Sequence, residues 1–125
     1  MTLKIIFDTN FLIDMIRFKV GFEKIEENLN EKVEFFILEN TVDELKKISL
    51  QKGKTGGYAK LILKILGKRA IKVLKTKEAN TDNALIDMAK EGFVIATNDM
   101  GIRGKIKKLG LKAIYLRGKK EIMMS

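Results

Sequence analysis

Acidic side chains recur in this sequence where a short hydrophobic run gives way to a segment with helical spacing. Four carboxylates share this placement: Asp8, Glu44, Asp82 and Asp99. In a parallel sheet such junctions lie along the same edge, so acids far apart in the sequence can converge there. Like charges in close contact repel strongly, and a cluster of ionised carboxylates therefore needs a cation. Mg²⁺ and Mn²⁺ prefer hard oxygen ligands and act on phosphates, so we expect one of them here.

Each of these acids also has a structural explanation, because Asp, Asn and Thr are favoured at helix N-termini. Asp8 follows a buried run, where an ionised group is costly without a cation, so we expect it to be functional. Glu44 belongs to a stretch that fits a capping box, in which it would reach back to the amide of Thr41. Helical spacing places Glu44 beside the inward stripe and Asp43 on the outer side, so both roles of Glu44 stay open.

The same spacing separates the two acids of the segment Thr81–Glu91. Asp82 falls in the first turn on the flank of the inward face, whereas Asp87 falls on the opposite side and should be solvated. Asp99 either caps the helix that follows it or binds the cation. Three polar side chains beside these acids could orient a water molecule or a phosphate, and they are Asn10 (also a candidate helix cap), Thr97 and Asn98.

The composition narrows the chemistry that these acids can perform. The 125 residues include 25 Lys and Arg against 16 Asp and Glu, which gives a formal net charge of +9 at pH 7. A positive field of that size favours a polyanion, most commonly nucleic acid; an anionic membrane surface or a generic Lys- and Glu-rich surface are the alternatives. The sequence contains no Cys and no His, which excludes disulfides, Ser–His pairs and most zinc sites.

Basic side chains occur in two groups that could hold a polyanionic strand. One group follows Asp99 on the same predicted helix and consists of Arg103, Lys105, Lys107 and Lys108. The other surrounds a glycine-rich segment, where Lys54 is a cation and Tyr58 could stack on a base. Contacts of this kind give affinity for phosphates without reading a base sequence. A plain solvated surface explains any one lysine equally well.

Repeated strand-then-helix units predict a single α/β domain over residues 1–125, with helices packed on a mostly parallel sheet. Five apolar runs are expected to be strands: Leu3–Phe7, Val33–Leu38, Ile71–Leu74, Phe93–Ala96 and Ala113–Leu116. Six segments are expected to be helices: Asn10–Arg17, Gly21–Asn30, Thr41–Leu50, Tyr58–Leu66, Thr81–Glu91 and Met100–Leu109. We expect the glycine-rich segment 52–57 to be mobile, and the residues after Arg117 carry too few signals to assign.

No apolar run reaches the roughly 18 residues that cross a bilayer, and the N-terminal residues lack the hydrophobic region of a secretion signal. We therefore expect a soluble, cytoplasmic protein. Four apolar residues could serve a homodimer or a protein partner, or equally the core, and they are Phe18, Phe22, Met123 and Met124.

Taken together, the motifs resemble those of PIN-domain ribonucleases. The resemblance rests on Asp8-Thr9-Asn10, Val42-Asp43-Glu44-Leu45, Thr81-Asp82-Asn83-Ala84 and Ala96-Thr97-Asn98-Asp99, and continues through Ile102–Gly110 to Ile114–Arg117. It covers nearly the whole chain. It implies a three-layer sandwich with a mostly parallel five-stranded sheet, and a Mg²⁺ or Mn²⁺ site formed by the acids at positions 8, 44, 82 and 99.

Several biological roles are compatible with this resemblance. The stretches Val42–Leu45 and Ile102–Lys107 look more similar to archaeal relatives of ribosomal-RNA processing endonucleases, which implies a metal-dependent endoribonuclease that cuts pre-ribosomal RNA. A toxin ribonuclease of a toxin–antitoxin pair has the same chemistry, and a non-cleaving RNA-binding PIN scaffold in a ribonucleoprotein is the alternative that is not an enzyme. Many processing relatives carry paired acids where this chain has Asp82-Asn83, which argues against a second metal. Phosphatases of the haloacid dehalogenase type are similar at Asp8-Thr9-Asn10 but carry a second carboxylate that this chain lacks.

Overall fold

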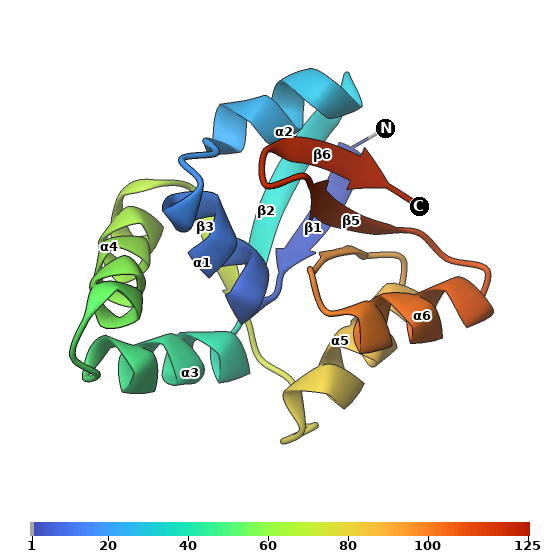
Figure 1. Ribbon diagram of the computed structural model, residues 1–125. Coiled ribbons are helices and arrows are strands. Elements are labelled where there is room, and N and C mark those ends of the chain that lie inside the picture. The colour runs from blue at the N-terminus through green and yellow to red at the C-terminus, as the bar shows by residue number, and fades with distance from the viewer. Residues whose placement is uncertain (1) are drawn as a thin grey trace.

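Strands and helices alternate along the chain in the computed structural model, which describes residues 2–125 (Figure 1). The strands are β1 (Thr2–Phe7), β2 (Lys32–Leu38), β3 (Ile71–Leu74), β4 (Val94–Ala96), β5 (Ala113–Arg117) and β6 (Glu121–Met124). The helices are α1 (Thr9–Arg17), α2 (Phe22–Leu29), α3 (Glu39–Ser49), α4 (Lys54–Lys68), α5 (Thr81–Lys90) and α6 (Met100–Lys108). None of these helices is both long enough and apolar enough to cross a membrane.

The strands form one sheet in the order β3-β2-β1-β4-β5-β6, with β1 and β4 at its centre. Strands β1 to β5 run parallel, and the edge strand β6 runs antiparallel to β5. At the carboxyl end of β1, Phe7 lies in register with Ile37 of β2 and Ala96 of β4. Asp8 and Thr97, which follow Phe7 and Ala96, therefore leave the sheet at the same edge.

The central strands are apolar on both faces because helices cover the sheet from both sides (Figure 1). Ile5 and Phe7 belong to a core shared with α1, α2 and α4, whereas Ile6 belongs to the core beneath α5 and α6. The Phe7 ring centroid lies 5.4 Å from that of Phe22 and 5.3 Å from that of Phe35. Phe22 therefore serves the core, and burial of each such side chain contributes about 1.5–3 kcal/mol to holding β1 in place.

Helices α3 and α4 pack against each other at their junction. A Cβ atom at Gly56 would collide with the backbone oxygen of Gln51, whereas a Cβ at Gly57 would meet nothing within 4 Å. Gly56 is buried, so the first turn of α4 approaches the end of α3 more closely than any side chain would permit. This close approach fixes the position of α3 relative to the rest of that layer.

The expected strands are present in the structure, but a sixth strand was not predicted. Strand β6 follows a three-residue loop in which Gly118 and Lys119 have φ of 57° and 78°. A glycine adopts positive φ at little cost, and this loop reverses the chain so that β6 pairs with β5. The sheet is therefore six-stranded and mixed at one edge, within the expected α/β class.

Two predicted helix starts were wrong. Helix α3 begins at Glu39, two residues before the expected start at Thr41, because Leu38 takes the extended N-cap conformation without a side-chain cap. Helix α4 begins at Lys54, so most of the glycine-rich segment expected to be mobile is helical. The close approach of Gly56 to the carbonyl of Gln51 requires a glycine here, which accounts for the glycine in a helical turn.

Candidate active site

Asp8 forms the centre of the candidate site, at the point where β1 ends and α1 begins. Its main-chain N–H donates to the carbonyl of Ala96 (2.8 Å), which ties the ends of β1 and β4 together. Its Oδ1 accepts from the N–H of Thr9 (2.8 Å), and its Oδ2 accepts from the hydroxyl of Thr97 (2.7 Å). The expectation that Asn10 caps α1 is therefore wrong, since Asp8 does so with its side chain buried.

The surroundings of Asp8 disfavour its charge. Burial raises the pKa of the Asp8 carboxyl from its ordinary value of 3.8, because a low-dielectric environment destabilises the ionised form. The hydrogen bonds from Thr97 and Thr9 oppose this rise in pKa, while the negative charges of Glu44 and Asp82 add to it. Two of the predicted partner acids therefore lie close enough to repel the Asp8 charge, and a cation between them would relieve that repulsion.

Thr97 connects Asp8 to Asp99. The Thr97 hydroxyl donates to Asp8 and accepts from the main-chain N–H of Asp99 (3.1 Å). Oδ1 of Asp99 accepts from the N–H of Ile102 (3.0 Å), which makes Asp99 the N-cap of α6. Its other oxygen, Oδ2, forms no hydrogen bond with any of residues 2–125, so the Asp99 side chain has a free oxygen for a ligand as well as a structural role.

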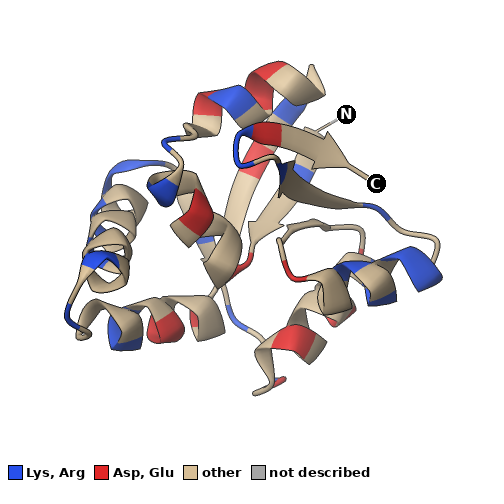
Figure 2. Ribbon diagram, viewed as in Figure 1, with Lys and Arg blue, Asp and Glu red and all other residues tan. Residues whose placement is uncertain are grey.

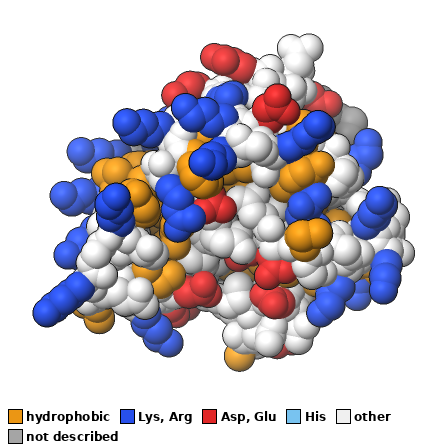
Figure 3. Space-filling model, in the orientation of Figure 1, with side chains coloured by type: hydrophobic (Ala, Val, Ile, Leu, Met, Phe, Trp, Pro, Cys, Tyr) orange, Lys and Arg blue, Asp and Glu red, His pale blue; other side chains and the backbone are white. Residues whose placement is uncertain are grey.

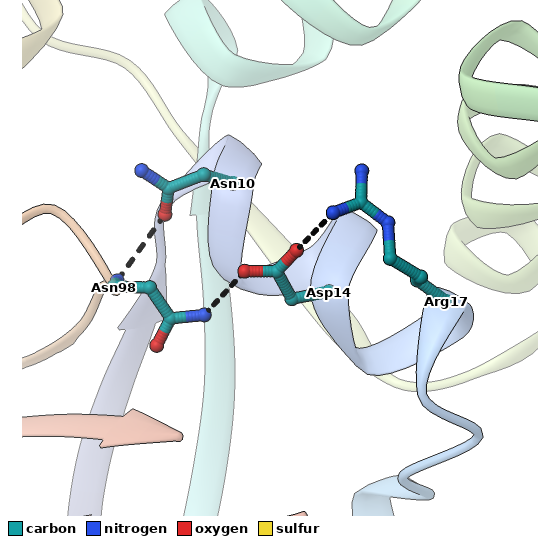
Figure 4. Close-up of polar contacts among 4 residues, drawn as sticks. All are labelled: Asn10, Asp14, Arg17 and Asn98. Carbon is teal, nitrogen blue, oxygen red and sulfur yellow. Dashed lines mark hydrogen bonds and ion pairs between the residues drawn. The ribbon is translucent and has the colours of Figure 1, made fainter. Parts of the chain in front are cut away.

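Asn98 joins three elements around the site (Figure 4). Its Nδ2 donates to Oδ2 of Asp14 on α1 (2.8 Å). Its Oδ1, in a contact that the figure does not draw, accepts from the N–H of Leu116 on β5 (2.9 Å). Its main-chain N–H donates to Oδ1 of Asn10 (3.3 Å), and Asp14 also forms an ion pair with Arg17 (3.4 Å). Both asparagines were expected to bind substrate. In the structure their side chains hold the junction of β4 and α6 against α1.

Asp14 and Arg17 are residues that the sequence did not single out. The side chain of Asp14 is 23% exposed, and its partner Asn98 lies 84 residues away in the sequence. No local spacing rule could identify that pairing. The single available signal was an acid on the border of the apolar face of α1, three residues before a basic residue.

Glu44 and Asp82 lie on the exposed side of the site. A hollow of about 470 Å³ lies between α3 and the segment that leads into α5. Asn40 donates from Nδ2 to the carbonyl of Glu78 (2.9 Å) and so holds that segment against α3. Asp43, which helical spacing placed on the outer side of α3, is exposed and lines this hollow together with Glu44.

Glu44 is not part of a capping box. Helix α3 already includes Thr41, which is fully buried in its first turn, and Leu38 is the N-cap. The exposed carboxylate of Glu44 is therefore not needed to satisfy the helix end. Asp82 lies in the first turn of α5, as expected, and is also exposed, while Asn80 caps that helix with its side chain.

The donor set fits a hard divalent cation in a partly open site. Among residues 2–125, no three acidic side chains stand close enough to form a complete metal cage. Mg²⁺, however, commonly binds through one or two carboxylates and keeps several of its waters. Asp8 has a second lone pair on each oxygen and lies within electrostatic reach of Glu44 and Asp82. This all-oxygen arrangement suits Mg²⁺ or Mn²⁺.

Basic side chains flank this acidic centre. Figure 2 shows Lys and Arg along α4 and α6, with acidic residues near the carboxyl end of β1 and on α3 and α5. In the space-filling view, acidic side chains gather around a hollow in the lower middle of this face, with basic side chains on both sides (Figure 3). The predicted substrate ligands comprise exposed Lys54, Lys105, Lys107 and Lys108, and half-buried Tyr58 and Arg103.

Comparison with known proteins identifies the family. A family model described as a PIN-like domain matches residues 5–119, which is most of the chain. The chain belongs to the PIN-domain family. Ribonuclease VapC4 of Methanocaldococcus jannaschii is 34% identical over 122 residues, which span 94% of this chain and 92% of VapC4.

Solved structures confirm the PIN fold. The PIN domain endonuclease Utp24 superposes with a TM-score of 0.81 at 22% identity, covering 98% of this chain and 90% of Utp24. A domain of a functionally unknown protein from Methanocaldococcus jannaschii gives a TM-score of 0.65 at 23% identity, with 95% and 94% covered. The resemblance inferred from the four motifs is thus confirmed, with the parallel sheet as expected and one antiparallel strand in addition.

Proposed function

We propose that this PIN domain is a metal-dependent endoribonuclease that hydrolyses RNA phosphodiester bonds. The observation that carries the proposal is the state of Asp8: a carboxylate buried at the sheet edge, held through both oxygens and repelled by Glu44 and Asp82. A protein that only bound RNA would gain nothing from negative charges facing phosphates. The relative named as a ribonuclease supports the same activity.

Asp8 would hold the cation directly, with Glu44, Asp82 and the free oxygen of Asp99 contacting it directly or through water. A divalent cation at this position supplies charge neutralisation at the phosphate and a more acidic water molecule. The protein's own hydrogen bonds would orient the carboxylates that hold the cation. Thr97 fixes the Asp8 carboxylate by donating to Oδ2, and Asn98 fixes the junction that bears Thr97 and Asp99.

For the biological role, we propose the processing of pre-ribosomal RNA, on the strength of the motif resemblance in α3 and α6. The similarity to VapC4 supports a second candidate, a ribonuclease that acts as the toxin of a toxin–antitoxin pair. The two roles share the same chemistry and differ in the RNA that is cut. Mapping the cleaved RNAs after expression in a host cell would separate them, because a processing enzyme cuts precursors and a toxin arrests growth.

Cleavage assays test the activity itself. Purified protein is incubated with labelled structured and single-stranded RNA in Mg²⁺, in Mn²⁺ and in EDTA. We expect cleavage that needs the cation and is lost in Asp8→Asn and reduced in Asp82→Asn. The matched control is Asp87→Asn, an exposed acid on the same helix α5, which should cleave like the wild type. RNA binding without cleavage in any metal would contradict the proposal and favour a PIN scaffold.

A further inference from the structure

A shallow pocket lies on α6 directly beside the candidate active site. It has a volume of about 290 Å³ and is lined by Met100, Arg103, Gly104, Lys107, Tyr115 and Ser125. Its α6 members are spaced three and four residues apart and therefore share one face of the helix. Asp99, one of the site acids, is the N-cap of α6, and Met100 follows it directly, so the pocket begins one residue after the site.

Arg103 is an unneutralised cation in this pocket. Its guanidinium carbon lies 3.5 Å from the ring centroid of Tyr115, and the side chain is half-buried. It forms no ion pair and no side-chain hydrogen bond with any residue in the described part of the chain, whereas Arg17 and Arg69 are both paired with acids. Stacking on the ring holds the planar group in one orientation. Its Nε is buried without a partner among residues 2–125, so the donors left for an external group are those of the two terminal Nη atoms.

The rest of the pocket suits an oxyanion. Lys107 adds a second positive charge one turn further along α6. Gly104 leaves the helix backbone bare between them, and a Cβ there would meet nothing within 4 Å. A guanidinium fork binds phosphate oxygens through paired charge-assisted hydrogen bonds, so the occupant that fits this pocket is a phosphate group.

We propose that Arg103, stacked on Tyr115 and assisted by Lys107, forms a subsite for a backbone phosphate of the RNA strand next to the bond that is cut. This inference rests on the proposed function and assigns one part of it to one pocket. It distinguishes Arg103 and Lys107 from Lys105 and Lys108, neither of which lines the pocket. Lys105 lies roughly on the opposite side of the helix at 100° per residue. The subsite positions the strand and takes no part in bond cleavage.

Binding measurements at increasing salt test the subsite. The protein carries Asp8→Asn and EDTA is present, so that a fluorescein-labelled single-stranded RNA stays intact while its anisotropy is measured. Arg103→Gln should weaken binding about tenfold, and it should reduce the slope of log K against log salt by about 0.7, the value for one phosphate contact on a single strand. Arg103→Lys should keep the slope but lose part of the affinity, because the planar fork is gone.

Two further variants keep the test independent of folding. Gly104→Glu places a carboxylate in the pocket without a steric conflict and should weaken binding more than Arg103→Gln, with a melting temperature no lower than that of the parent. Lys32→Gln removes a charge at the amino end of β2, far along the sheet from the site edge, and should leave the affinity and slope nearly unchanged. In cleavage assays, where the protein keeps its native Asp8, Arg103→Gln should raise KM more than it lowers kcat.

The outcomes separate the subsite from the proposed function. If the wild type neither binds nor cuts RNA, the proposed function fails and the subsite fails with it. If the wild type cuts RNA while Arg103→Gln and Gly104→Glu bind with the same affinity and slope as Lys32→Gln, the subsite alone is overturned. Weaker binding of Arg103→Gln with an unchanged slope would also overturn it, because Arg103 would then support Tyr115 without touching a phosphate.

Discussion

Asp8 and Glu44 present carboxylates to the same region, but the protein holds them in different ways. Asp8 is buried at the centre of the sheet and accepts hydrogen bonds at both oxygens. Glu44 is exposed on α3, and its carboxylate accepts no hydrogen bond from the described residues. Protein hydrogen bonds therefore fix one side of the site before any ligand arrives, and the cation and substrate must order the other side.

The sharpest test of this comparison removes one carboxylate from each side. Asp8→Asn should lower metal-dependent RNA cleavage about a thousandfold, because the anchored ligand of the cation is lost. Glu44→Gln should lower it about 10- to 100-fold, the range typical of groups that support a metal from outside its inner ligands. Initial rates at saturating Mg²⁺ measure both. Equal losses would mean that Glu44 is held as firmly as Asp8 once metal binds.

A second test disturbs the packing of α3, the helix that carries the exposed Glu44, without replacing an acidic residue. Gly56→Ala should destabilise the protein by about 1–3 kcal/mol, because the added methyl group collides with the end of α3. Gly57→Ala, one residue further on α4 and open to space, should be neutral or stabilising by up to about 1 kcal/mol. Urea unfolding gives both values. A stable Gly56→Ala variant would show that α3 and α4 can shift apart freely.

A third test removes Asn98, whose hydrogen bonds hold the junction of β4 and α6 beside the buried Asp8. Asn98→Ala leaves the N–H of Leu116 without its partner, which costs about 1–3 kcal/mol, and removes the bond to Oδ2 of Asp14, whose Oδ1 keeps its ion pair with Arg17. We expect lower stability in denaturant unfolding and slower cleavage, since Thr97 and Asp99 flank this residue. Asn28→Ala, an exposed position on α2, is the control and should change neither.

The smallest expected effect is in the pH dependence of stability without metal. Because burial raises the pKa of Asp8, the folded protein keeps that proton to a higher pH than the unfolded chain does. The contribution of Asp8 to stability therefore falls as the pH rises from 3.8 to the raised pKa. In EDTA, Asp8→Asn should remove this decline and melt slightly higher than the wild type at neutral pH. Added Mg²⁺ should stabilise the wild type and not the variant, and melting curves across pH report both.

Much of the fold could be read from the sequence because the parallel strands are buried on both faces. Short apolar runs such as Leu3–Phe7 and Phe93–Ala96 are typical of buried parallel strands in a small α/β chain. Strand β6 is an edge strand with only its two middle side chains half-buried, and its sequence offers only the short apolar run Ile122–Met124 without a clear alternation. Its one local signal is the glycine at position 118, which alone does not predict a hairpin.

The site was predictable where the chemistry is local and unpredictable where it depends on distant partners. The position of Asp8 directly after β1 and that of Asp82 in the first turn of α5 followed from local sequence alone, although Asp82 comes eight residues after Leu74, where β3 ends. The early start of α3 removed the capping role of Glu44, and no residue type marks that start, since Leu38 caps without a side-chain hydrogen bond. The hydrogen bond between Asn98 and Asp14 could not be predicted without the strand order, because it depends on β1 and β4 being neighbours in the sheet.

The hydrogen bond between Asp8 and Thr97 spans 89 residues of sequence. The two groups meet only when β1 and β4 lie side by side at the centre of the sheet, and that pairing closes a long stretch of intervening chain at an entropic cost. During synthesis, the emerging chain carries Asp8 and Glu44 long before it carries the hydroxyl that fixes Asp8. The acidic centre therefore needs the first 99 residues of the chain, and any shorter fragment lacks the Asp99 carboxylate and, if it ends before position 97, the Thr97 hydroxyl as well.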